Sequence, residues 1–156
     1  MCGIIARIGN GDAITKLVSG LENLEYRGYD SAGVAVQNGS GISVYKRSGQ
    51  VSELKDELVS SVPKGNVGIG HTRWSTHGPP TDENAHPHTS QTDKVAVVHN
   101  GIIENYTELK EMLRENGHEF TSDTDPEVLP PLFDYYLENS HENVTAFRQP
   151  LRDLEG

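Results

Sequence analysis

The chain has 156 residues and a net charge of −10, so it is one domain or a piece of one, and its acidic surface disfavours nucleic-acid and anionic-membrane partners. No apolar run reaches transmembrane length, and no signal peptide opens the chain. Its single cysteine excludes an internal disulfide framework, and we expect a reducing, cytoplasmic setting.

The first third of the chain predicts a strand, a helix and a hairpin. Residues 3–8 are apolar except for Arg7 and predict a short buried strand, and Asp12 is a candidate cap for the helix that follows. The apolar positions on one face of that helix are Ile14, Leu17, Val18, Leu21 and Leu24. Residues 25–33 have neither a helical nor a strand period. Residues 34–36 and 42–45 flank an Asn-Gly turn and predict a β-hairpin.

The middle of the chain contains two further strand patterns separated by a long loop. Residues 51–62 predict a helix. Its inward positions are Val51, Leu54, Leu58 and Val62. Residues 67–73 predict a strand, and residues 95–98 predict another, buried one. The polar loop over 74–93 is long enough that we expect it to be functional or disordered.

The last third predicts helices. One runs over 105–116, with Glu108 at capping-box spacing and Gly117 as its stop. Asp125 followed by Pro126 is a good helix start. The whole pattern indicates a mixed α/β layer protein that ends on a helix.

Three prolines conflict with these helical patterns. Pro130 and Pro131 fall in the second turn after Asp125, and Pro150 falls inside the final helical stretch. A proline inside a helix costs about 3 kcal/mol or produces a kink. We therefore expect irregular helices in this part of the chain.

The N-terminus carries a candidate nucleophile. The chain begins Met1-Cys2-Gly3, and methionine aminopeptidases remove Met1 when a small residue follows. Cys2 would then carry an α-amine with a reference pKa of about 7.7–8.0 beside a thiol of about 8.5. A base and a nucleophile on one residue are the equipment of an N-terminal-nucleophile hydrolase. The alternative is that Cys2 is a small buried apolar residue.

A strand end carries a candidate carboxylate-binding group. Arg73 offers a planar guanidinium suited to a two-pronged carboxylate contact, and Thr76 and His77 add hydrogen-bonding capacity. Functional side chains often lie where a strand gives way to a loop. The alternative is an ordinary surface ion pair of Arg73.

A second strand end carries a candidate oxyanion hole. The side-chain amide of Asn100 lies beside the backbone N–H of Gly101. Two such donors stabilise the charge that develops when a thiolate attacks an amide. The alternative is that Asn-Gly at a strand end is only a turn.

Asp125 can be explained in two ways. As a helix N-cap it would contribute about 1 kcal/mol. As a binding residue it would pair with a substrate ammonium and form, with Arg73, a clamp for both charges of an α-amino acid. His86 and His88 admit a metal, but no residue set has a recognisable zinc spacing, so we favour packing for both. No phosphate-binding glycine motif is present, and we expect no cofactor.

Six segments, in this order, carry a family resemblance. They are Cys2-Gly3-Ile4-Ile5 and the segments 25–33, 71–78, 84–88, 99–105 and 122–127. Together they resemble the glutaminase domains of the glutamine–fructose-6-phosphate aminotransferases, a group of class II glutamine amidotransferases. The resemblance spans essentially the whole chain. Amidophosphoribosyltransferases usually read His-Val-Arg-Tyr-Ser-Thr and asparagine synthetases His-Arg-Arg-Leu where this chain reads His-Thr-Arg-Trp-Ser-Thr-His-Gly.

The resemblance implies a fold and a chemistry. The fold would be α+β, a four-layer αββα sandwich of the N-terminal-nucleophile hydrolases with antiparallel sheets. Cys2 would attack the glutamine side-chain amide with its own α-amine as general base. Asn100 and Gly101 would form the oxyanion hole. A thioester to glutamate would form, ammonia would leave, and water would release glutamate.

The resemblance also implies how glutamine is held. Arg73 would grip the α-carboxylate with Thr76 and His77 beside it, and Asp125 would pair with the α-ammonium. Trp74 would belong to a closing loop that gates ammonia passage. No metal or cofactor takes part in this scheme.

We expect residues 1–156 to form a partial glutaminase domain, because the family continues into further strands and then into sugar isomerase domains. Those absent domains would bind fructose 6-phosphate, which receives the ammonia to give glucosamine 6-phosphate. Pro126 stands where the family usually has Thr or Ser, and this puts the support of Asp125 in question. Two alternatives stay open: a catalytically silent binding or regulatory module, and an amidotransferase for another acceptor such as phosphoribosyl pyrophosphate. A homodimer is a further hypothesis.

Overall fold

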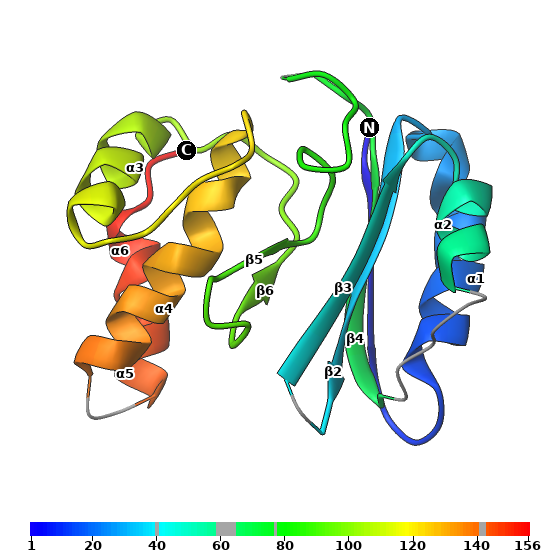
Figure 1. The fold of residues 1–156 in the computed structure, drawn as a ribbon, viewed down its shortest axis with the longest axis horizontal. Helices are drawn as coiled ribbons and strands as arrows, with labels where there is room; N and C mark the ends of the chain where they lie inside the picture. Colours follow the sequence, from blue (N-terminus) through cyan, green and yellow to red (C-terminus); the bar gives the residue numbers. More distant parts are fainter. Residues whose placement is uncertain (40, 59–64, 77, 141–142) are drawn as a thin grey trace.

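The structure, a computed structural model, describes residues 1–39, 41–58, 65–76, 78–140 and 143–156. In this part of the chain the elements stack as helices, sheet, sheet and helices (Figure 1). The first two layers come from residues up to Arg73, and the other two come from the rest of the chain. This order is that of the expected αββα sandwich.

The first sheet contains the strands β1, β4, β2 and β3, in that order and antiparallel throughout. Their bounds are β1 Gly3–Ile8, β2 Ser31–Asn38, β3 Gly41–Ser48 and β4 Val67–Arg73. The register pairs Gly3 with Thr72, so the start of β1 lies beside the end of β4. Cys2 and Arg73 are thereby neighbours, although they are far apart in the sequence.

Helices α1 (Ala13–Leu24) and α2 (Val51–Leu58) cover one face of this sheet (Figure 1). The Asp12 side chain accepts hydrogen bonds from the N–H groups of Ile14 and Thr15, so the predicted cap is confirmed. The apolar face of α1 packs against β2 in a core that excludes water. Its members from α1, β2 and α2 include Leu17, Leu21, Val34, Val36 and Leu54. Val62, the last inward position predicted for α2, lies outside the described residues.

The predicted burial of two strands is wrong. In β1 only Gly3 is buried, whereas the side chains of Ile4 and Ile8 are 43% and 80% exposed, because β1 is an edge strand whose residues alternate between two faces. The run over 95–98 is half-buried, and only Ala96–Val97 form a strand, β6. It pairs with β5 (His88–Thr89), which lies inside the loop predicted over 74–93.

The fourth layer packs around a second core. Its elements are α3 (Tyr106–Glu115), a 3₁₀ turn η2 (Asp125–Val128), α4 (Leu129–Asn139), α5 (Asn143–Arg148) and α6 (Pro150–Asp153). The buried apolar side chains of this second core come from α3, η2, α4 and the segment before α3. They are Ile103, Leu109, Leu113, Val128, Leu129 and Leu132.

The prolines begin helices rather than interrupting them. The turn η2 ends at Val128 and α4 begins at Leu129, so Pro130 and Pro131 lie in its first turn, where N–H groups have no intrahelical partner. Pro150 is the first residue of α6. The prediction that these prolines lie inside helices is therefore wrong, because the sequence pattern joined into one helix elements that are separate in the structure.

The start of α3 also differs from the prediction. The Asn105 side chain does not cap the helix. It donates to Asp153 O at 2.7 Å and accepts from Glu155 N at 3.1 Å, so it holds the C-terminal segment. Gly117 has φ +88° and ends the helix as predicted. None of the helices formed by the described residues is long and apolar enough to cross a bilayer.

Candidate active site

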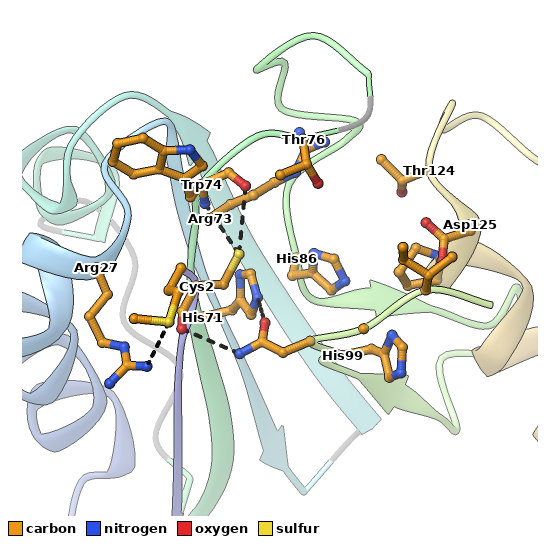
Figure 2. A pocket seen from close by; sticks show the side chains of 15 residues that line it. Cys2, Arg27, His71, Arg73, Trp74, Thr76, His86, His99, Thr124 and Asp125 are labelled. Atoms are coloured by element: carbon orange, nitrogen blue, oxygen red, sulfur yellow. Dashed lines mark hydrogen bonds between the residues drawn. The ribbon is translucent and has the colours of Figure 1, made fainter. Parts of the chain in front are cut away.

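A pocket of about 530 Å³ lies between the end of the first sheet and the segments around residues 100 and 125. Figure 2 shows the side chains of Cys2, Arg73, Thr76 and Asp125 around it. Its lining includes most of the predicted site residues, namely Cys2, Arg73, Trp74, Thr76, Asn100, Gly101 and Asp125. His77 lies outside the described residues.

Cys2 is held at the mouth of this pocket by the end of β4. Its half-buried Sγ accepts a hydrogen bond from the backbone N of Trp74 at 3.3 Å (Figure 2). Met1 also lines the pocket and is 80% exposed. The alternative of a buried apolar cysteine is wrong, because the sulfur faces the pocket.

The segment 25–33, which has no sequence period, wraps the end of β4. A Cβ added at Gly28 would lie 2.6 Å from the carbonyl carbon of Arg73, so only glycine permits this approach. Asp30 N donates to Arg73 O at 3.0 Å, and the Asp30 carboxylate accepts from Ser75 N at 2.7 Å. The segment therefore fixes the backbone that presents Arg73 and Cys2.

Arg73 is a buried cation. Its side chain is 5% exposed and its Nη1 donates to Pro79 O at 3.2 Å. Burial lowers the pKa of the guanidinium, while electrostatic interactions with Cys2, Asp30 and Asp125 act to raise it. An arginine keeps its charge under such a shift, so the pocket contains a fixed positive group.

Asn100 lies against the backbone of Cys2. Its Nδ2 donates to Cys2 O at 3.4 Å, and its Oδ1 is 2.8 Å from His71 Nε2. Gly101 follows, and a Cβ there would lie 2.9 Å from the His99 ring. The amide of Asn100 and the backbone of Gly101 thus both line the pocket beside the sulfur.

Asp125 is not a helix cap. Thr124 occupies the cap position of η2, and the Asp125 Oδ2 accepts from the backbone N of Ile103 at 2.8 Å. The carboxylate is half-buried and belongs to the pocket lining. Pro126 leaves it in place, since the first turn of a helix tolerates proline.

Three histidines form a buried stack at the site, and two of them, His71 and His86, line the pocket. The His71 and His86 rings are stacked, with their centroids 4.4 Å apart. The His86 and His88 rings meet edge to face, with their centroids 4.6 Å apart. Burial lowers the pKa of His71 to about 4 and that of His88 to about 3, so both are neutral at pH 7. His86 and His88 are both buried and packed within this stack. Among the described residues, no three His, Cys, Asp or Glu side chains gather as a metal site would require.

A buried amide joins the two sides of the pocket. Asn84 Oδ1 accepts from Ser122 Oγ and from Asp123 N, both at 2.9 Å. Its Nδ2 donates to Pro79 O, which also accepts from Arg73. The sequence singled out the segments that contain Asn84, Ser122 and Asp123 but not their contacts, which only the tertiary structure shows.

The comparisons with known proteins identify the family and the fold. A family model described as a glutamine amidotransferase domain matches residues 55–147, more than half of the chain. The chain therefore belongs to the glutamine amidotransferase domain family. Its fold is also that of solved relatives. It superposes on the glutamine phosphoribosylpyrophosphate amidotransferase from B. subtilis, solved with ADP and GMP, with a TM-score of 0.79 at 27% identity.

The chain is similar along its whole length to named enzymes. It is 49% identical to an isomerizing glutamine–fructose-6-phosphate aminotransferase of Thermus thermophilus and 53% identical to that of Clostridium tetani. It covers 26% and 25% of those proteins, about a quarter of their length. The superposition on the B. subtilis structure includes all of this chain and 33% of that one. A second solved structure, described as the allosteric regulatory enzyme of purine biosynthesis, matches all of this chain with 34% of its own length, at a TM-score of 0.80 and 28% identity. The resemblance and the expected N-terminal-nucleophile fold are confirmed.

Proposed function

We propose that this domain hydrolyses the side-chain amide of L-glutamine to glutamate and ammonia through a thioester on Cys2. The observation that carries the proposal is the shared pocket. A cysteine sulfur, two candidate oxyanion donors and two groups of opposite charge line it, although they come from separate parts of the chain. Each group matches one part of a glutamine molecule or of its transition state.

Two charges select an α-amino acid. Arg73 offers its guanidinium to the α-carboxylate, and Asp125 offers its carboxylate to the α-ammonium. Thr76 lines the same pocket and adds a hydroxyl for the carboxylate. The proposal also assigns His77 to this binding role. Trp74, whose ring centroid lies 5.5 Å from that of Tyr29 in an edge-to-face arrangement, would close over the bound amino acid. The side-chain amide of glutamine then reaches toward Cys2.

The reaction at Cys2 needs a free α-amine. Removal of Met1 frees that amine and empties the part of the pocket that Met1 lines. The amine takes the thiol proton, and the sulfur attacks the amide carbon to form a C–S bond. The resulting oxyanion accepts from the Asn100 amide and the Gly101 N–H.

The intermediate then collapses with ammonia as the leaving group. The α-ammonium of Cys2 returns its proton to the amide nitrogen, the C–N bond breaks, and a thioester to glutamate remains. Water, deprotonated by the same amine, attacks the thioester. The C–S bond breaks, glutamate is released, and the thiol is restored.

We infer that the ammonia serves fructose 6-phosphate, giving glucosamine 6-phosphate, in a larger enzyme. The identity of 49–53% to proteins named for that reaction supports this acceptor. The structural likeness to a phosphoribosylpyrophosphate amidotransferase supports the competing acceptor, but at 27% identity. The residues of segment 71–78 favour the first. A cytoplasmic location and a homodimer belong to the same proposal.

Intact-mass spectrometry with an electrophilic glutamine mimic, 6-diazo-5-oxo-L-norleucine, tests the proposal. We expect loss of Met1 and one adduct per chain, together with glutamate release from glutamine. The Cys2→Ala variant should show neither the adduct nor glutamate release, and the D-isomer of the mimic should react far more slowly. A folded chain that forms no adduct and releases no glutamate would support the silent-module alternative.

A further inference from the structure

The orientation of the Asn100 side chain decides whether it can serve an oxyanion. Asn100 follows β6 in a segment without regular structure and is exposed, so helix or strand geometry does not fix its side chain. An amide has a donor end and an acceptor end of the same shape. Rotated by half a turn, Asn100 would present an oxygen to the developing negative charge and oppose the reaction.

Two partners define which end faces which way. The Cys2 carbonyl can only accept a hydrogen bond, so the group 3.4 Å from it must be the Asn100 NH₂. The Asn100 oxygen then faces His71, with Oδ1 2.8 Å from Nε2. Because that oxygen can only accept, the proton of the neutral His71 ring must be on Nε2.

His71 is fixed more firmly than Asn100 is. It belongs to β4, paired on one side with Ile4 and on the other with Gly33, and its side chain is 1% exposed. Its ring stacks on His86 at 4.4 Å (Figure 2). Burial lowers its pKa to about 4, so the ring is neutral with one proton at pH 7.

We propose that His71 is the positioning residue of the oxyanion hole, whose Nε2–H holds the Asn100 amide with its NH₂ toward Cys2 and the substrate. One amide N–H then binds Cys2 O, and the other points at the oxyanion. The His71 ring lines the same pocket, and in this proposal it acts on the reaction through Asn100. This inference rests on the proposed function, since it assigns Asn100 to the oxyanion.

The first test needs no activity. Long-range ¹H–¹⁵N NMR of the full chain at pH 7 reports the tautomer of each histidine, and His71→Gln assigns the signal. We expect protonated Nε2 and unprotonated Nδ1 in His71. A proton on Nδ1 would overturn the inference whether or not the chain hydrolyses glutamine. An inactive wild-type chain with the Nε2–H tautomer would contradict the proposed function alone.

The second test separates positioning from folding by kinetics. The His71→Leu variant loses the donor, and His71→Gln keeps an amide N–H near the place of Nε2. Loss of one oxyanion donor lowers kcat by about 10²–10³-fold, so we expect this loss in His71→Leu and a recovery of at least tenfold in His71→Gln. KM for glutamine and alkylation of Cys2 by iodoacetamide should change less than about twofold. Equal losses in both variants would contradict the inference.

A double-mutant comparison with Asn100 completes the test. If His71 acts through Asn100, adding His71→Leu to Asn100→Ala lowers kcat no further. Independent, multiplying losses would show that His71 acts in another way. His88→Leu is the matched control, a buried histidine of the same stack that contacts Thr124 Oγ1 at 3.1 Å instead of Asn100. Its effect should multiply with that of Asn100→Ala.

Discussion

Cys2 and Arg73 stand at the ends of two paired strands, whereas Asn100, Gly101 and Asp125 stand outside the regular strands and α-helices. The first side of the pocket is positioned by the backbone ladder between β1 and β4. The second side is positioned by single hydrogen bonds, such as those from His71 to Asn100 and from Ile103 N to Asp125. We call these the strand side and the loop side.

The difference shows what each side requires from the sequence. A ladder is made of backbone groups, so the strand side depends little on particular side chains. It depends on glycines such as Gly28, which lets the neighbouring backbone approach Arg73 closely. The loop side depends on particular buried polar side chains, among them His71 and Asn84. Loss of one partner there leaves the other buried and unsatisfied, at a cost of about 1–3 kcal/mol.

Truncating one leucine in each core tests whether the two sides fold together. Leu17→Ala, in the core behind the strand side, and Leu132→Ala, in the core behind the loop side, should each lower the free energy of unfolding by about 2–5 kcal/mol. We expect one cooperative transition in urea, because the Asn84 contacts and the histidine stack join the halves. The unfolding transitions measured by Trp74 fluorescence and by far-ultraviolet circular dichroism should have the same midpoint. Dichroism lost before Trp74 fluorescence in Leu132→Ala would show that the loop side unfolds by itself.

Acidification should weaken the contact between the sides. His71 and His88 have pKa values lowered to about 4 and about 3, against 6.5 when unfolded, so the unfolded chain binds more protons below pH 6.5. The contribution of these two neutral histidines to the free energy of unfolding is complete above pH 6.5. It is lost as the pH falls toward their pKa values in the folded chain. Between pH 6.5 and pH 5 the loss is about 2 kcal/mol for each histidine.

Urea titrations at pH 7, 6 and 5 measure this loss. The His88→Gln variant, which keeps a side chain able to bond Thr124, should show a shallower dependence than the wild-type chain. The lowered pKa values of Asp12 and Asp82 act below pH 4 and so outside this window. An equal free energy of unfolding at pH 7 and pH 5 would contradict the conclusion that His71 and His88 are neutral in the folded chain.

Arg73→Lys and Asp125→Asn compare the two sides in substrate binding. Lysine keeps the charge but loses the planar fork, and asparagine keeps an acceptor for Ile103 N but loses the charge. A hydrogen bond to a charged group is worth about 1.5–3 kcal/mol, so each variant should raise KM for glutamine about 10–100-fold. Steady-state glutamate release gives kcat and KM. An unchanged KM in either variant would remove that residue from the amino-acid clamp.

The smallest expected effects come from Asp12→Ala and Asn105→Ala. Each should cost about 1 kcal/mol, the first by loss of the α1 cap and the second by loss of two contacts to the C-terminal segment. Hydrogen exchange separates them. Exchange should accelerate at Ile14 and Thr15 in Asp12→Ala, and at Glu155 in Asn105→Ala. Faster exchange along the start of α3 in Asn105→Ala would mean that Asn105 is a cap after all.

Local signals in the sequence predicted most elements of the first half. The side-chain period of α1, the Asp12 cap and the Asn-Gly hairpin are each decided within a few residues, so they are readable without a tertiary structure. The candidate site residues were also named from the sequence, because Cys2, Arg73, Asn100 and Asp125 stand at strand or helix ends within recognisable motifs. Of the site residues predicted from the sequence, only His77 lies outside the described residues.

Local signals failed where an element's neighbour decides its role. Residues 3–8 are apolar enough for a buried strand, but β1 has a partner on one side only in the described sheet. Asn105 has the type and spacing of a cap, but the C-terminal segment competes for its side chain. Pro130 and Pro131 conflict with one continuous helix and fit two shorter elements.

The sequence by itself determined the family and predicted the candidate nucleophile and the candidate charged groups, since residue types and short spacings carry that information. Only the tertiary structure decided how the groups are held. The buried His71–His86–His88 stack, the bonds of Asn84 across the pocket and the Asp125–Ile103 contact all join residues distant in sequence. Such contacts depend on how two layers pack against each other, and a local sequence pattern does not encode which distant residues this packing brings together.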